Sequence, residues 1–307
     1  MILAGFSYYL FVMVVFGGEK LMAEIKLISL DVDGTLLSST GKLSEQNKSA
    51  VKAAIQKGVR VVLNTGKPAC AIKGEIDELG LKDAIITMGG ALIHDISDPN
   101  DWKTIHSEYL PADVLPRIAP LVEDLPLTQH VLVENETYFF HVNDSQAYLE
   151  YFRNYLKINN FSGWKYLDRS PLKDSRVSLS PILKIVFHSD EDEPVDEAFR
   201  RIKLIEDDII MIGYSAPRTI DISPRLSGKL ESIKYLCNLY GIKSEEIMAL
   251  GDYETDLPLI NWAGVGAVMG NAPDFVLDQA PRLAPENDQA GVAYMIDKFV
   301  LKDSQRG

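Results

Sequence analysis

The sequence predicts an α/β protein with a doubly wound, Rossmann-like parallel-sheet core and an inserted α+β cap domain. Two observations favour this architecture. Short apolar runs alternate with helical stretches over residues 23–90 and again over 225–307, and such alternation is typical of parallel strands joined by right-handed helical crossovers. Between these parts, over 91–224, the alternation is less regular and acidic or proline-rich loops appear, so we assign this segment to the cap.

The first predicted strand runs from Ile25 to Leu30 and is followed at once by Asp31 and Asp33. A short apolar run rich in leucine and isoleucine, as here, suits a buried strand of a parallel sheet. Two carboxylates about 4 Å apart repel each other by roughly 4 kcal/mol at an effective dielectric constant near 20. A divalent cation would remove that cost, and oxygen ligands suit Mg²⁺. An acidic turn without an ion is the alternative interpretation.

Residues 45–57 are predicted to form a helix that begins after Ser44 and ends at Gly58. Serine is a favoured N-cap, and glycine readily adopts the left-handed conformation that ends a helix. The β-branched run Val59–Leu63 then predicts a second strand. A strand, a helix and a strand in this order indicate a parallel pair with a right-handed crossover.

A hydroxyl, a glycine and a cation follow the second strand as Thr65, Gly66 and Lys67. At the start of a helix, such side chains together with backbone amides can bind an oxyanion. A plain helix-start turn, with Pro68 at the first helical position, explains the same residues. A third strand is predicted at Asp83–Thr87.

The α/β pattern resumes at Ser227, which is predicted to cap the next helix. Lys229 then lies in the first turn, where the helix dipole disfavours a cation unless an anion is bound nearby. An ordinary surface lysine is the alternative. The following strand, Ile247–Leu250, leads directly into a second acidic cluster that contains Asp252 and Asp256.

In an open parallel sheet, ligands bind outside the carboxyl ends of the strands. Carboxylates, a lysine and a hydroxyl on one rim suit a metal ion and a phosphoryl group. A carboxylate can attack phosphorus, a neighbouring acid can protonate the leaving oxygen, and Mg²⁺ and lysine can neutralise the developing charge. The residues expected at this rim are Asp31, Asp33, Thr65, Lys229, Asp252 and Asp256.

Taken together, the motifs resemble those of the haloacid dehalogenase-like phosphohydrolase superfamily. They are most similar to its Cof-type branch, which carries a large cap between the second and third motifs. The resemblance extends over about Ala23–Phe299 in motif order. The first motif reads D-V-D-G-T-L-L, the second T-G-K and the fourth G-D-x-x-x-D, with Lys229 as the third. The V-M-G-N-A run and the closing N-D-x-x-G-V are also similar to this branch.

The resemblance implies a Mg²⁺-dependent phosphatase that acts through an aspartyl-phosphate intermediate. Asp31 would be the nucleophile and a metal ligand, and Asp33 would be the general acid and base, with its backbone carbonyl on the metal. Asp252 would complete the metal ligands. The other implied roles are phosphate binding by Thr65, Lys229 and Asn271, and support of the site by Gly66 and Asp256.

Four positions depart from the pattern of this branch. Lys67 replaces the usual arginine of the second motif, which keeps the charge but loses the planar fork. Met88 begins a Met-Gly-Gly run where an asparagine is usual. Leu230 follows the third-motif lysine where glycine is common, and Thr255 precedes the last aspartate of the fourth motif where asparagine is frequent. These departures leave the substrate, more than the chemistry, undetermined.

The net charge of −13 over 307 residues argues against nucleic acid as a partner, because surfaces that bind nucleic acids are basic. The two cysteines, Cys70 and Cys237, form no disulfide framework and fit a reducing, cytoplasmic compartment.

A small phosphorylated metabolite, such as a sugar phosphate, is the expected partner. A phosphomutase of related fold and a catalytically silent binding protein are the alternatives. Neither the substrate nor the oligomeric state follows from the sequence.

Residues 1–18 are strongly apolar and carry no charge. The stretch is shorter than the about 20 residues of a membrane span, and it lacks the basic start of a signal peptide. We expect translation to begin at Met22, with the first 21 residues as upstream sequence, and in the domain assignment 1–22 is an upstream or disordered segment. A membrane anchor or signal and an extra packed helix are the alternatives, and a membrane partner is not expected.

Overall fold

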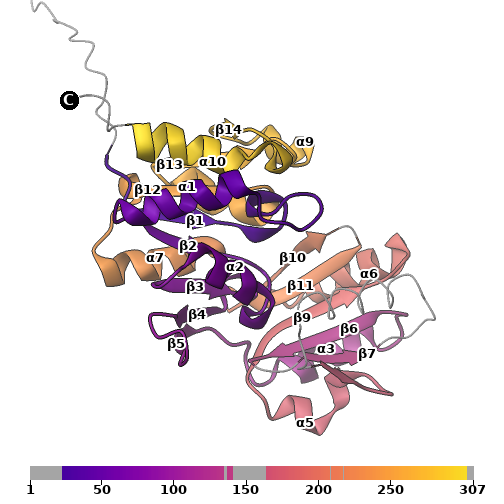
Figure 1. Cartoon of the computed structure of the whole chain (residues 1–307). Coiled ribbons are helices and arrows are strands. Elements are labelled where there is room, and N and C mark those ends of the chain that lie inside the picture. The colour runs from indigo at the N-terminus through magenta and orange to yellow at the C-terminus, as the bar shows by residue number, and fades with distance from the viewer. Residues whose placement is uncertain (1–22, 135–136, 141–163, 208, 217, 303–307) are drawn as a thin grey trace, which may run out of the picture.

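The computed structural model shows a parallel-sheet core flanked by helices and a separate antiparallel region beside it (Figure 1), so the predicted fold class is confirmed. The expectations about 1–22 lie outside the described residues. Among the helices of the described chain, none is long and apolar enough to cross a membrane. The structure describes residues 23–302 except 135–136, 141–163, 208 and 217.

Five parallel strands form the core sheet, in the order β14-β13-β12-β1-β2. Strand β1 pairs with β12 on one side and with β2 on the other, so Leu30 lies opposite both Leu250 and Leu63. The carboxyl ends of these three strands therefore meet at one edge. The strands are β1 (Leu27–Leu30), β2 (Arg60–Leu63), β12 (Ile247–Gly251), β13 (Val265–Met269) and β14 (Leu283–Ala284).

Helices cover both faces of the core sheet. Successive residues of a strand point to opposite faces, so each strand contributes apolar side chains to both helix layers. Ile28 and Leu30 lie in one apolar cluster with residues of α1, α2 and α10, whereas Leu27 lies in another with residues of α7, α8 and α9. These helices are α1 (Glu45–Gln56), α2 (Lys73–Leu79), α7 (Lys229–Tyr240), α8 (Leu257–Trp262), α9 (Asp274–Leu277) and α10 (Gly291–Ile296).

The helix ends test two of the predicted caps. Ser44 caps α1 as predicted, since its hydroxyl accepts a hydrogen bond of 3.2 Å from the amide of Asn47. The predicted capping role of Ser227 is wrong. Its hydroxyl donates to the carbonyl of Pro224 at 2.6 Å, and Gly228 takes the N-cap position of α7 instead. Short polar side chains often prefer such a local backbone partner over a helix end.

A three-stranded antiparallel sheet, β3-β4-β5, extends the core. It comprises β3 (Ala84–Thr87), β4 (Leu92–Asp95) and β5 (Lys103–Ser107). A parallel bridge between Asn64 and Ile86 joins it to the end of β2. Within the segment 91–224 that the sequence assigns to the cap, β4 thus pairs with β3, and β5 pairs with β4.

The cap contains a six-stranded sheet in the order β10-β11-β9-β6-β7-β8. Its pairs are antiparallel except β7 with β8. Helices α3 and α6 pack on one face of the sheet, over residues such as Ile185 and Phe187. The cap elements are β6 (Thr128–Val133), β7 (Thr137–Phe140), β8 (Trp164–Tyr166), β9 (Ile182–His188), β10 (Ile210–Ala216), β11 (Thr219–Pro224), α3 (Val114–Val122), α5 (Ser175–Ser178) and α6 (Asp192–Lys203).

Candidate active site

Three aspartates meet at the carboxyl edge of the core sheet. Asp31, Asp252 and Asp256 each offer a carboxylate oxygen, and these three oxygens lie within 4.8 Å of one another. The topology explains the meeting, because Leu30 and Leu250 are register partners on adjacent parallel strands, and the two acidic loops leave those strands side by side. The structure thus brings together acidic residues that are far apart in the sequence.

Lys229 lies inside this cluster. Its Nζ is 2.6 Å from Oδ1 of Asp31 and 2.6 Å from Oδ1 of Asp256, and only 8% of the lysine side chain is exposed. The lysine is the first residue of α7, so the start of that helix carries the cation into the site. A buried ion pair is favourable only when its geometry compensates for the cost of removing both charges from water.

The position of Asp252 is fixed by the turn that follows β1. The hydroxyl of Thr35 donates to Oδ1 of Asp252 at 3.0 Å. Gly34 has a φ of +74°, and a Cβ at that position would lie 2.2 Å from Oδ2 of Asp252. Only glycine fits both this conformation and this contact. Sequence reasoning assigned no role to Thr35, although the residue belongs to the first motif.

The charges in the cluster are not balanced. Burial raises the pKa of Asp31 to about 8, a shift that Lys229 opposes and that Asp256 and Asp252 reinforce. Burial, followed by the charge of Asp256, likewise raises the pKa of Asp252 to about 6. Burial alone would lower the pKa of Lys229, but its two carboxylate partners raise it. Three carboxylates around one ammonium leave excess negative charge, and their hard oxygen donors are the ligand type that Mg²⁺ prefers.

Asp33 does not join this cluster through its side chain, which is 60% exposed. Its Oδ1 lies 2.7 Å from Nζ of Lys67, whose own side chain is only 14% exposed. The lysine that departs from the second-motif pattern is therefore the partner of the second aspartate of the first motif. No sequence rule links these two residues, which are 34 positions apart.

Two further predicted site residues have backbone-directed contacts. Thr65 is buried after β2, and its hydroxyl oxygen accepts a hydrogen bond of 3.2 Å from the amide of Lys67. Asn271 donates to the carbonyl of Gly34 at 2.9 Å and accepts from the amide of Asn287 at 2.9 Å. The side chain of Asn271 thus fastens the turn after β1.

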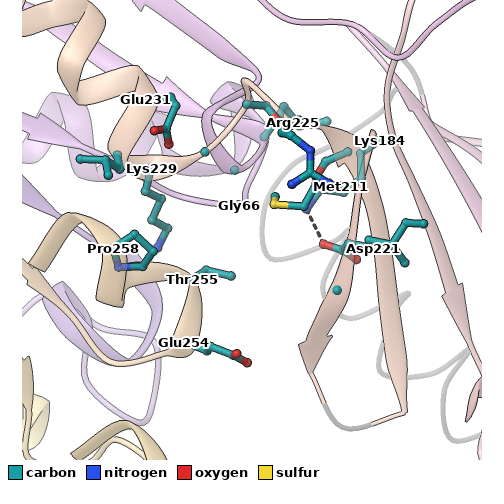
Figure 2. A pocket seen from close by; sticks show the side chains of 18 of the residues that line it. Gly66, Lys184, Met211, Asp221, Arg225, Lys229, Glu231, Glu254, Thr255 and Pro258 are labelled. Carbon is teal, nitrogen blue, oxygen red and sulfur yellow. Dashed lines mark hydrogen bonds and ion pairs between the residues drawn. The ribbon is translucent and has the colours of Figure 1, made fainter. Parts of the chain in front are cut away.

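A cavity of about 450 Å³ separates this edge of the core from the cap sheet (Figure 2). This volume lies within the range of small-molecule sites, about 300–1,000 Å³. Lys229 reaches the cavity from the core, and Lys184, Met211 and Asp221 face it from the cap. The predicted supporting residue Gly66 lies on its wall. A ligand in this cavity would therefore contact the acidic cluster's lysine and the cap together.

Comparisons with known proteins find similarity over most of the chain. The protein YxeH of Bacillus subtilis is 30% identical over 285 residues, which cover 90% of this chain and 98% of YxeH. The 5-amino-6-(5-phospho-D-ribitylamino)uracil phosphatase YwtE of the same bacterium is 26% identical and covers 90% of this chain and 98% of its own length. A solved haloacid dehalogenase-like hydrolase from B. subtilis has the same fold, with a TM-score of 0.77 at 24% identity over 90% of this chain and 100% of that one.

The motifs resemble those of the haloacid dehalogenase-like superfamily, and a sequence profile of that family tests the resemblance. The profile of the haloacid dehalogenase-like hydrolases matches residues 28–296, which include both acidic turns, the buried lysine and the whole cap. The resemblance is confirmed, and with it the expectation of a hydrolytic enzyme. The chain belongs to the haloacid dehalogenase-like hydrolase family.

Proposed function

We propose that the protein is a Mg²⁺-dependent phosphatase that hydrolyses small, sugar-phosphate-like phosphomonoesters through an aspartyl-phosphate on Asp31. The observation that carries this proposal is the double contact of Lys229 with Asp31 and Asp256, next to Asp252. A buried ammonium beside a buried carboxylate provides a cation for the phosphoryl oxygens and a nucleophile for the phosphorus. The similarity to YwtE, whose name specifies a phosphorylated substrate, supports the substrate class.

The side chains of Asp31 and Asp252 and the backbone carbonyl of Asp33 would hold the Mg²⁺ ion. The excess negative charge of the aspartate cluster supports this assignment. When bound, the ion would neutralise charge on the phosphoryl oxygens and lower the pKa of its ligands. Asp256 accepts hydrogen bonds from the amides of Asp252 and Tyr253, and it would thereby stabilise the conformation of the loop after β12.

The reaction would proceed in two displacements. In the first, a carboxylate oxygen of Asp31 forms a bond to phosphorus, the bond from phosphorus to the substrate oxygen breaks, and Asp33 donates a proton to the leaving alcohol. In the second, Asp33 takes a proton from water, the water oxygen attacks phosphorus, and the bond to Asp31 breaks to release phosphate. Lys229 and the hydroxyl of Thr65 would bind the transferred phosphoryl group throughout.

For Asn271 the contacts favour a different role from the one that the resemblance implies. Both ends of its amide are bound, to the carbonyl of Gly34 and to the amide of Asn287. We assign it the task of holding the turn that carries the catalytic aspartates, in place of a direct phosphate contact.

The proposal is tested by measuring phosphate release from a panel of phosphomonoesters, with Mg²⁺ and with EDTA. The wild type should release phosphate only with Mg²⁺, and Asp31→Asn should release none. Asp77→Asn, which removes a surface carboxylate paired with Lys73, is the matched control and should behave as the wild type. Equal turnover by Asp31→Asn would refute the covalent step. Conversion of the ester to an isomer without release of phosphate would favour a phosphomutase.

A further inference from the structure

An ion pair on the cap faces the cavity. Lys184 of β9 and Asp221 of β11 lie with Nζ and Oδ2 2.6 Å apart, and their side chains are 15% and 16% exposed. Both line the cavity, and Figure 2 shows the pair opposite the loop that carries Thr255. The ammonium of Lys184 also lies close to the core. Its Nζ is 3.6 Å from the position that a Cβ would take on Gly89. The pair therefore lies at the junction of cap and core, across the cavity from the buried lysine of the active site.

The charged side chains that line this cavity balance one another. Among the described lining residues, three basic side chains face three acidic ones, and the basic side chain closest to the reaction is already paired with two aspartates. A substrate with a second anionic group would thus find no excess positive charge. The charged lining residues are Lys184, Arg225, Lys229, Asp221, Glu231 and Glu254.

Arg225 is bound to its own domain. Its Nε donates to the carbonyl of Asp207 at 2.7 Å, and its Nη2 donates to the carbonyl of Ile210 at 3.1 Å. The same Nη2 lies 3.2 Å from Oε1 of Glu206. These contacts hold the guanidinium of Arg225 within the cap. We therefore do not assign it to the binding of an anionic substrate group.

The pair itself offers donors and acceptors side by side. An ammonium has three N–H groups, and a carboxylate can accept several hydrogen bonds. One ammonium next to one carboxylate can therefore hydrogen-bond to neighbouring hydroxyls of a ligand, as donor and acceptor. Apolar side chains complete the wall and can pack against the carbon chain of a polyol. They are Met88, Met211, Ile212, Leu230 and Pro258.

We propose that Lys184 and Asp221 bind the alcohol part of the substrate, and that they select a neutral polyhydroxylated group over one that carries a second phosphate or a carboxylate. This inference rests on the proposed phosphatase function and makes its substrate class more specific. The compensated charge of the pair selects against a second anion, and its hydrogen bonds select for hydroxyl groups.

The test compares kcat/KM for fructose 6-phosphate, for fructose 1,6-bisphosphate and for phenyl phosphate, whose alcohol part has no further hydroxyl. The wild type should prefer the monophosphate. Lys184→Met should lower kcat/KM for fructose 6-phosphate about 10- to 100-fold, the size expected for hydrogen bonds to a charged group, mainly through a higher KM. The loss for phenyl phosphate should be at least about fivefold smaller, because this ester makes no hydroxyl contact.

Asp221→Asn provides a second variant with an opposite expectation. It leaves the charge of Lys184 uncompensated, so the ratio of kcat/KM for the bisphosphate to that for the monophosphate should rise. Lys173→Met removes the lysine of a cap ion pair with Glu123 that does not line the cavity, and it should leave all three substrates unaffected. Equal losses for fructose 6-phosphate and phenyl phosphate in Lys184→Met, or an unchanged ratio in Asp221→Asn, would overturn the inference. A wild type without activity on any ester would instead refute the phosphatase proposal.

Discussion

The hydroxyl of Thr35 donates a hydrogen bond of 3.0 Å to Oδ1 of Asp252, although 217 positions separate the two residues in the sequence. This contact joins the turn after β1 to the turn after β12. It lies beside Gly34, whose lack of a side chain makes room for the carboxylate. The two acidic turns therefore form one unit, and a change in either should displace the carboxylates of both.

The variant Gly34→Ala tests this unit. Its Cβ would lie 2.2 Å from the carboxylate of Asp252, so we expect the aspartate to shift and kcat/KM to fall by about 100-fold, as displacements near 1 Å can produce. Gly41→Ala is the matched control, since Gly41 also has a positive φ, +71°, but a Cβ there would have no neighbour within 4 Å. The control should cost about 1–2 kcal/mol of stability and keep its activity. Similar activities of the two variants would argue against the tight coupling.

The variant Lys229→Met should be strongly destabilised. Removal of the ammonium leaves Asp31 and Asp256 without their shared buried partner, and breaking a buried pair costs about 3–5 kcal/mol. The free energy of unfolding is measured by urea denaturation in EDTA. Mg²⁺ should restore part of the loss, because a cation can compensate the same carboxylates, but it should not restore phosphatase activity.

A surface lysine gives the reference for this experiment. Lys173 pairs with Glu123 on the cap, and both side chains are more than half exposed. Lys173→Met should therefore cost no more than about 1 kcal/mol. If the two lysine variants had equal free energies of unfolding in EDTA, the buried ion pair would contribute no more to stability than the exposed one.

The order of the motifs predicted that the residues of the candidate active site would lie close together. Asp31 and Asp252 follow apolar runs that are long enough for buried strands, and parallel strands end at the same edge of a sheet, so their proximity follows from local pattern and topology. Lys229 was placed by the same reasoning at a helix start facing that edge. These inferences depend on backbone geometry that the sequence pattern determines.

Side-chain directions did not follow from the sequence. The pairing of Asp33 with Lys67 and the contacts of Asn271 depend on which partner each side chain meets after folding. The same holds for Ser227, whose hydroxyl has a local carbonyl and a helix end as competing partners. Such choices involve differences of about 1 kcal/mol per hydrogen bond, which residue type and spacing do not resolve.

Binding of Mg²⁺ should stabilise the folded protein. A ligand that binds only the folded state adds about 2.7 kcal/mol at a concentration 100 times its Kd. We expect Mg²⁺ to raise the Tm of the wild type in a thermal scan, and Asp252→Asn to lose most of that increase because the cluster loses one carboxylate. Glu254→Gln, a charge removal in the same loop but outside the cluster, is the control and should keep the increase. An undiminished increase in Asp252→Asn would exclude Asp252 as a ligand.

The cap should lose stability in acid through Asp207. Arg117 donates to Oδ2 of Asp207 at 2.8 Å, and the amides of Ile209 and Ile210 donate to Oδ1 at 2.9 and 2.8 Å. The hydrogen bond from Arg117, together with those from the two amides, lowers the pKa of Asp207 to about 2. Because the unfolded chain has the ordinary pKa of about 3.9, this stabilisation is complete above that pH and is lost as the pH falls towards the folded value.

The urea midpoint of the wild type should exceed that of Asp207→Asn near neutral pH, and the difference should narrow between about pH 4 and pH 2. A difference that stays constant down to about pH 2 would show that the carboxylate is not held in its charged form by these contacts.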